Sequence, residues 1–217
     1  MNRRRIAILT GISLILMTVI AGFSFGYAYS EFYKPEQLES FKSNILNNQV
    51  LYKIMLIGIL LILILDLLVS YTLYKYFVND NRKVSLASAI IRIIYTLVFG
   101  IATFFLTKNL NINEVTNQSI NTNFQSFQLI WNIGLIIFGF HILLIGVLMK
   151  LHRRIPKILW YLTLIAGVSY VFVHTLKLTS PNSEFVMNLE IILALPMALG
   201  ELGLAIWLLI KGGNNSQ

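Results

Sequence analysis

Six long runs of apolar residues alternate with shorter polar segments along the chain. The runs cover residues 6–29, 51–77, 84–106, 127–149, 158–176 and 185–210. About 20 helical residues span the hydrocarbon core of a bilayer, so each run is long enough to cross it. The runs are too long and too continuously apolar for barrel strands. The pattern therefore predicts an all-α polytopic membrane protein, with one bundle of six transmembrane helices over residues 1–217.

The composition also indicates that lipid is the main solvent of the chain. Hydrophobic residues make up 57% of it and charged residues 12%, whereas soluble domains carry about 25% charged residues. The absence of Cys excludes disulfides, thiolate metal ligands and thiol catalysis. The net charge of +8 does not indicate nucleic acid, because the basic residues stand at the ends of the apolar runs, as membrane anchors do. The predicted partner is the bilayer.

The basic residues are divided unequally between the two ends of the runs. One side holds Arg3, Arg4, Arg5, Lys75, Arg82, Lys83, Lys150, Arg153, Arg154, Lys157 and Lys211. The other side holds only Lys34, Lys42, Lys108 and Lys177. Because positive charge marks the cytoplasmic side, the sequence predicts that both termini are inside. The outer segment 31–49 has apolar residues that a short surface helix would use, but a solvated connector is the expected form of both 31–49 and 107–125.

The first apolar run could be read as a signal peptide instead of a transmembrane helix, because residues 1–5 resemble the basic start of a signal peptide. The apolar part of a signal peptide has about 7–15 residues, and this run is longer. Gly22 and Gly26 also have the small-xxx-small spacing that favours close helix packing. We therefore expect a retained helix.

The ionisable residues inside the apolar runs include Asp66, Arg92, His141, Glu190 and Glu201. Each costs roughly 3 kcal/mol at the centre of a membrane helix, so each needs a reason to be there. Four of them lie nine or ten residues from a cytoplasmic anchor, which is roughly 14 Å along a helix. Their common depth predicts an intramembrane polar cluster of Asp66, Arg92, His141 and Glu201.

Within this cluster, Asp66 and Arg92 are nearly symmetric about a short turn, which predicts an ion pair between neighbouring helices. Glu201 is then a surplus acid, and intramembrane acids are functional candidates by default. It shares a face of the last helix with small residues, so that face is expected to point away from lipid. The members of the face are Glu190, Ala194, Ala198, Glu201 and Ala205.

Glu190 and His174 are secondary candidates, near the outer side of the predicted bundle. His141, Glu201 and Asp66 match a metal site in ligand type, but they have no metal-ligand spacing, so no metal site is predicted. We find no complete catalytic or nucleotide-binding motif, and no cofactor is predicted.

The chain after the first run resembles a bacterial membrane family known as domain of unknown function 4386. The matching stretches include Leu65-Asp66-Leu67, Arg92, Phe138-Gly139-Phe140-His141, Ile155-Pro156-Lys157, Leu195-Pro196, Glu201 and Ala205-Ile206-Trp207. The resemblance implies a six-helix bundle in the bacterial cytoplasmic membrane, with the same four polar residues. It implies no activity.

The sequence is compatible with three classes of function. The simplest is a non-enzymatic membrane component in which the polar layer is structural. The second is a proton-coupled or small-solute transporter that uses Glu201 and His141. The third, a membrane-embedded enzyme or cofactor binder, has the least support, because the chain lacks a multi-His pattern.

Overall fold

The computed structural model describes residues 2–181 and 183–213, and six long helices dominate these ranges. The first spans Arg3–Phe32 and consists of α1 (Arg3–Ala21), the π-helical segment η1 (Gly22–Tyr29) and α2 (Ser30–Phe32). The others are α4 (Gln49–Phe77), α5 (Arg82–Lys108), α6 (Asn117–Leu151), α7 (Lys157–Thr179) and α8 (Glu184–Ile210). All six are long and apolar enough to cross a membrane, which confirms the predicted all-α bundle.

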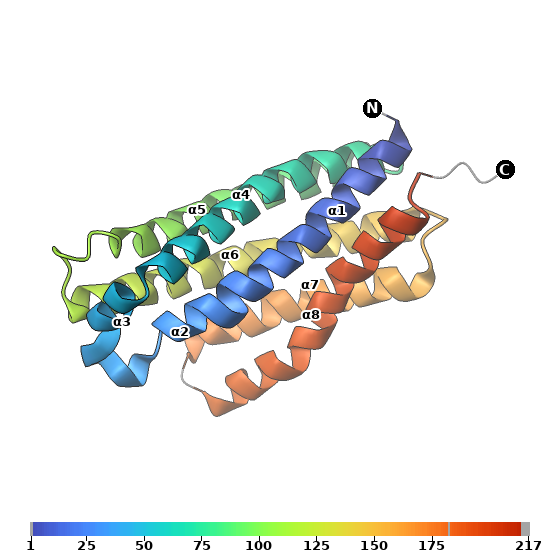
Figure 1. The fold of residues 1–217 in the computed structure, drawn as a ribbon. Coiled ribbons are helices and arrows are strands. Elements are labelled where there is room, and N and C mark those ends of the chain that lie inside the picture. The colour runs from blue at the N-terminus through green and yellow to red at the C-terminus, as the bar shows by residue number, and fades with distance from the viewer. Residues whose placement is uncertain (1, 182, 214–217) are drawn as a thin grey trace.

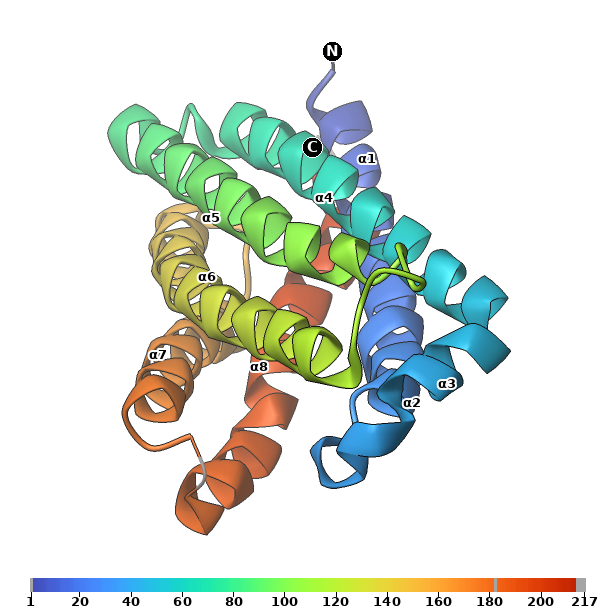
Figure 2. The ribbon, with the colours of Figure 1, turned by 90° about the vertical axis from the view of Figure 1, so that its left-hand side faces the viewer.

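The six helices are arranged as a ring. Each long helix packs against its neighbours in sequence, and α8 returns to pack against α1 (Figure 2). The start of α1 and the end of α8 lie at one end of the bundle, which we call the N/C end, and α3 (Phe41–Asn47) lies at the other, the α3 end (Figure 1). Towards the α3 end, α8 diverges from α1, and this divergence shapes the site described below.

Polar side chains set several helix starts. Asn2 and Asn81 accept hydrogen bonds from the backbone amides of Arg4 and Val84, at the starts of α1 and α5. Thr116 and Ser119 form a capping box that starts α6 at Asn117, well before the apolar run begins at residue 127. Much of the predicted connector 107–125 is therefore helix, because α6 continues past its apolar run.

The extension of α6 supports the short elements at the α3 end. The side chain of Asn117 accepts a hydrogen bond from the backbone amide of Lys42, which lies in α3. It also donates one to the carbonyl oxygen of Glu39, which lies in the preceding 3-10 helix η2 (Pro35–Ser40). Phe41 and Ile45 of α3 are buried. The expectation of a solvated connector over 31–49 is therefore wrong, because the segment holds the short helix α3, which packs against the bundle through these apolar residues.

Glycines bring two pairs of helices close together. A Cβ added at Gly139 of α6 would meet the backbone of Val171 on α7 at 2.9 Å, and one added at Gly11 of α1 would meet the carbonyl oxygen of Ala205 on α8 at the same distance. Only glycine allows these approaches. The prediction for Gly22 and Gly26 is wrong, because both lie in η1 with open space around them.

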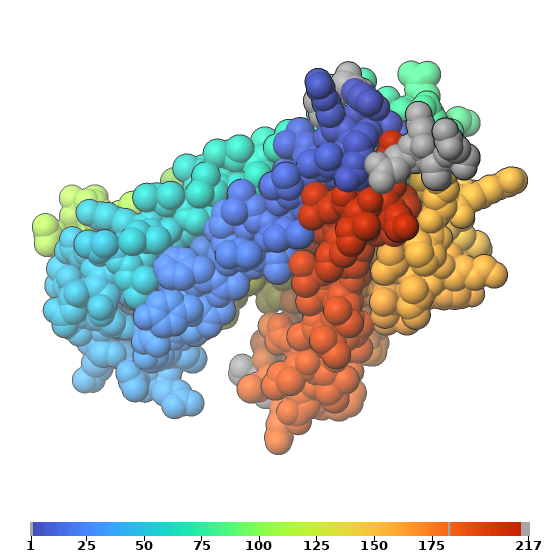
Figure 3. All heavy atoms as spheres, turned by 45° about the vertical axis from the view of Figure 1, so that its right-hand side comes forward, coloured from blue at the N-terminus to red at the C-terminus, as the bar shows by residue number. Residues whose placement is uncertain are grey.

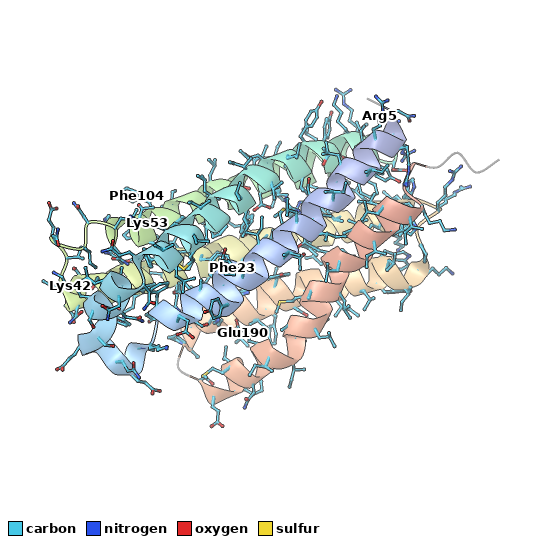
Figure 4. The ribbon with its side chains drawn as sticks, in the orientation of Figure 1. Arg5, Phe23, Lys42, Lys53, Phe104 and Glu190 are labelled. Atoms are coloured by element: carbon cyan, nitrogen blue, oxygen red, sulfur yellow. The ribbon has the colours of Figure 1, made fainter. Side chains whose placement is uncertain are left out.

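The outward faces of the ring carry large apolar side chains, including Phe23 and Phe104 (Figure 4). Val19 is 65% exposed and Ile191 is 72% exposed. An exposed apolar belt of this extent needs lipid to cover it, as expected for a multi-pass membrane protein.

Candidate functional site

Arg92 is the centre of a polar cluster inside the ring. Its side chain extends from α5 and is fully buried. Asp66 on α4, His141 on α6 and Glu201 on α8 all lie within hydrogen-bond distance of its guanidinium group. The structure therefore brings together the four residues that share a depth in the sequence, each from a different helix.

The Arg92–Asp66 pair is the tightest contact of the cluster. Arg92 donates from Nε at 2.9 Å and from Nη2 at 2.6 Å, and both bonds go to Oδ1 of Asp66. The two side chains are each 1% exposed. The second oxygen, Oδ2 of Asp66, is buried and has no hydrogen-bond partner in the described part of the chain. Such an orphaned carboxylate oxygen is costly, and buried polar groups of this kind usually have a partner.

His141 is held in one orientation by contacts on both ring nitrogens. Its Nε2 lies 3.1 Å from Nη1 of Arg92, and its Nδ1 lies 3.0 Å from the carbonyl oxygen of Ser88. Arginine can only donate, so Nε2 must accept, and the ring proton lies on Nδ1 and is donated to Ser88. His141 thus positions Arg92 as a neutral acceptor, without adding charge to the cluster.

Glu201 is bound more loosely than Asp66. Its Oε1 lies 3.4 Å from Nη1 of Arg92, and its side chain is 26% exposed. Two carboxylates therefore share one guanidinium. When both acids are ionised, the cluster carries one surplus negative charge. Of the two acids, Glu201 has the more accessible side chain.

A cavity of about 240 Å³ lies beside this cluster. Asp66 and Glu201 are part of its wall, and six aromatic side chains line it as well, namely Phe25, Tyr95, Phe99, Trp131, Phe138 and Tyr170. Apolar walls with a few convergent polar groups are typical of small-molecule sites, which usually start at about 300 Å³. The volume suits a small ligand or part of a larger one.

Two irregularities of the helices lie next to the cavity. Phe25 belongs to the π-helical segment η1, and its ring stacks on Trp131 with the centroids 4.5 Å apart. Pro196 lies inside α8, which continues through it, immediately before the cavity-lining residues Met197 and Ala198. Pro has no amide hydrogen to donate, so the helix is weakened at this point. Local π-helical turns are frequent at functional sites.

Comparison with known proteins identifies the family of this chain. The sequence pattern of a family described as "Domain of unknown function (DUF4386)" matches residues 9–212. The chain belongs to the DUF4386 family. The chain is also similar to an uncharacterized protein of Archaeoglobus fulgidus, with 29% identity over 162 residues, which covers 75% of this chain and 86% of that protein. No solved structure gives a significant match.

The secondary candidates of this DUF4386 chain lie outside the central cluster. Both carboxylate oxygens of Glu190 accept from Nζ of Lys177, at 2.7 and 2.9 Å. His174 is buried, and its Nδ1 lies 2.9 Å from Oδ1 of Asn132 on α6. Each therefore has a separate partner, and nothing in these contacts joins the two residues into one site.

The predicted small face of α8 is only partly inward. Ala205 is fully buried near α1, but Ala194 and Ala198 are exposed. The difference arises because α8 diverges from α1 towards the α3 end, so its outer half lacks a neighbour on that side. Ala198 instead lines the cavity.

The sequence did not indicate a second polar cluster, at the N/C end. Asp80, in the turn after α4, accepts from Nη2 of Arg3 at 3.1 Å and contacts Nδ1 of His152 at 2.9 Å. Arg4 donates to the carbonyl oxygens of Leu208, Leu209 and Gly212 at the end of α8. Asp80 is the only acid among the basic residues of that end in the sequence, which is the one available signal. The Arg4 contacts join the first helix to the last.

Metal ligation finds no support in the described residues, 2–181 and 183–213. No group of three or more His, Asp or Glu side chains there is arranged to hold an ion. Both nitrogens of His141 are engaged by Arg92 and Ser88.

Proposed function

We propose that this DUF4386 chain is a non-enzymatic membrane protein that binds a small molecule in its mid-membrane cavity. One observation carries the proposal: Glu201, the surplus acid, lines a cavity, and its side chain is 26% exposed. Among the described residues its carboxylate has one contact, at 3.4 Å, to a guanidinium group that Asp66 already binds more tightly. A ligand in the cavity that donates a hydrogen bond would give Glu201 a closer partner.

The geometry favours binding over catalysis. A catalytic base needs a free lone pair near the reacting atom, and both nitrogens of His141 are already engaged. Arg92 cannot lose its proton at any working pH. The surplus acid Glu201 is suited to balance a charge on a ligand or to carry a proton.

Transport is the second candidate, and Pro196 inside α8 favours it. The missing amide donor of Pro196 weakens the helix beside the cavity, which would let the outer half of α8 move relative to the inner half. A proton-coupled or small-solute transporter would use Glu201 in that movement. We further propose the bacterial cytoplasmic membrane as the location, with the N/C end inside, since most basic residues lie at that end.

The binding proposal is tested by analysing what the purified protein retains. The wild type is extracted in mild detergent, and its small-molecule content is measured by mass spectrometry against two variants. Ala198→Phe places a ring in the cavity, and Leu97→Phe adds the same group to a lipid-facing position that is 62% exposed. We expect a species that is present in the wild type and Leu97→Phe but lost in Ala198→Phe.

A second measurement covers weakly held ligands. Membrane extract is added back, and the midpoint of thermal unfolding is recorded for the same three proteins. A rise in the wild type and in Leu97→Phe, but not in Ala198→Phe, supports binding. Identical behaviour of all three proteins in both measurements would leave the polar layer as a structural element only.

A further inference from the structure

We propose that the ligand is an amphiphile with an ammonium head group, and that it reaches the cavity sideways from the bilayer between α1 and α8. This inference rests on the proposed function, since it names the chemical class of the ligand for the same cavity. Charge, ring chemistry and shape each support it separately.

The charge of the cluster selects a cation. Arg92 is the single cationic partner of Asp66 and Glu201 among the contacts of the described cluster, and His141 is neutral. A surplus negative charge in a low-dielectric site favours a positively charged guest. An ammonium group also has N–H donors for the accessible carboxylate of Glu201.

The aromatic wall selects the same head group. Six aromatic residues line a cavity that has only two acids, and the face of an aromatic ring attracts a cation. Arg92 already illustrates this preference, because its guanidinium carbon lies 5.4 Å from the ring centroid of Phe138. The walls beyond the cluster are apolar and include Leu14, Ile62 and Leu135, which suits a hydrocarbon tail.

The shape of the ring indicates the route. At the N/C end the two helices touch closely at Gly11, but towards the α3 end they separate, and a hollow lies between them in the space-filling view (Figure 3). Both helices contribute residues to the cavity wall, including Thr18 of α1 and Leu202 of α8. The outer half of α8 is strongly exposed, with Ile192 at 68% and Leu195 at 66%. The cavity is therefore open on its lipid side, between the two helices.

The test uses three probes that share an eight-carbon chain with a terminal bromine and differ in the head group, which is an ammonium, a hydroxyl or a carboxylate. Bromine quenches tryptophan fluorescence at short range, and Trp131 lines the cavity. The protein is placed in phosphatidylcholine nanodiscs. Subtracting the signal of the Trp131→Phe variant isolates Trp131 from the other two tryptophans of the chain.

We expect the ammonium probe to quench Trp131 at about tenfold lower concentration than the other two probes. Glu201→Gln keeps the shape of the side chain but removes its charge, so it should abolish the preference for the ammonium head. Leu97→Phe, the lipid-facing control, should retain the preference.

The possible outcomes separate this inference from the proposed function. Equal quenching by all three probes, lost in Ala198→Phe, would overturn the ammonium head group and leave a ligand-binding cavity. A preference for the carboxylate, or an ammonium preference that survives Glu201→Gln, would also overturn the inference. No quenching above the level of Ala198→Phe would overturn both proposals.

A final arm distinguishes two sources of the ammonium group. Nanodiscs are prepared with brominated acyl chains on phosphatidylethanolamine or on phosphatidylglycerol, which has no ammonium group. Stronger quenching by the ethanolamine lipid identifies a lipid head group as the ligand. Equal quenching by the two lipids, together with the preference for the free ammonium probe, identifies a free amine.

Discussion

Arg92 offers a quantitative test of the polar cluster, because its two acidic partners differ in geometry. The contact with Asp66 is as short as 2.6 Å between fully buried side chains, whereas the contact with Glu201 is 3.4 Å and its acid is 26% exposed. Arg92→Leu would leave a buried carboxylate without its cation, which costs about 3–5 kcal/mol of unfolding free energy. The partners should contribute unequally to this loss.

Two double-mutant cycles separate the contributions. The cycle of Arg92→Leu with Asp66→Leu should give a coupling energy of about 2–3 kcal/mol, because the double variant removes both buried charges. The cycle of Arg92→Leu with Glu201→Gln should give less than about 1 kcal/mol, because the contact is long and partly screened. As a control, Arg92→Leu combined with Asn109→Ala at the α3 end should be additive.

The free energy of unfolding can be measured in bicelles by steric trapping, which does not require denaturant. The ranking of the two couplings is the decisive result. Additive losses at Asp66 and Arg92, or a larger coupling for Glu201 than for Asp66, would refute the assignment of Asp66 as the main partner of Arg92.

Three further predictions follow from the packing and from the proposed orientation. Gly139→Ala should lower the free energy of unfolding by about 1–3 kcal/mol, because the new Cβ meets the backbone of α7. Gly100→Ala should not lower it, because a Cβ at Gly100 has nothing within 4 Å. Chemical or thermal unfolding checks both variants, and equal losses would contradict the close approach. Arg4→Ala should lower the free energy of unfolding by about 1–3 kcal/mol, because three carbonyl contacts at the end of α8 are lost. Arg4→Lys should recover only part of this loss, and full recovery would show that charge alone matters. With both termini inside, an impermeant thiol reagent applied to whole cells should label Gln118→Cys and not Arg153→Cys. The chain has no Cys of its own, so the label on the purified protein reports the engineered position alone, and the opposite pattern would invert the orientation.

The sequence predicted the features that depend on position along one helix. Six spans follow from run length, and the common depth of Asp66, Arg92, His141 and Glu201 follows from counting to the nearest basic anchor. Those counts need no knowledge of which helices are neighbours, and the structure brings the four residues into contact.

Features that depend on how the helices diverge could not be predicted in this way. The exposure of Ala198 follows from the separation of α8 from α1, and a helical-wheel argument assumes a neighbour on every small face. The Asp80–His152 contact joins two turns that are far apart in sequence. The open surroundings of Gly22 have the same origin, since its spacing with Gly26 says nothing about which helix lies opposite.

The contacts of Arg3 and Arg4 have a consequence for biogenesis. The helix that leaves the ribosome first in this bundle packs against the one that leaves last, and Arg4 binds carbonyl groups that exist only after α8 has been made. Until then the α8-facing side of α1, including Gly11, must face lipid or the insertion machinery, and the polar layer lacks Glu201. Ring closure is therefore the last step of assembly, and a chain that ends before α8 should be a target for membrane quality control. The proximity of the start of α1 to the end of α8 should also allow a circular permutant. It would join the first helix to the last through a short linker and begin in the loop after α5.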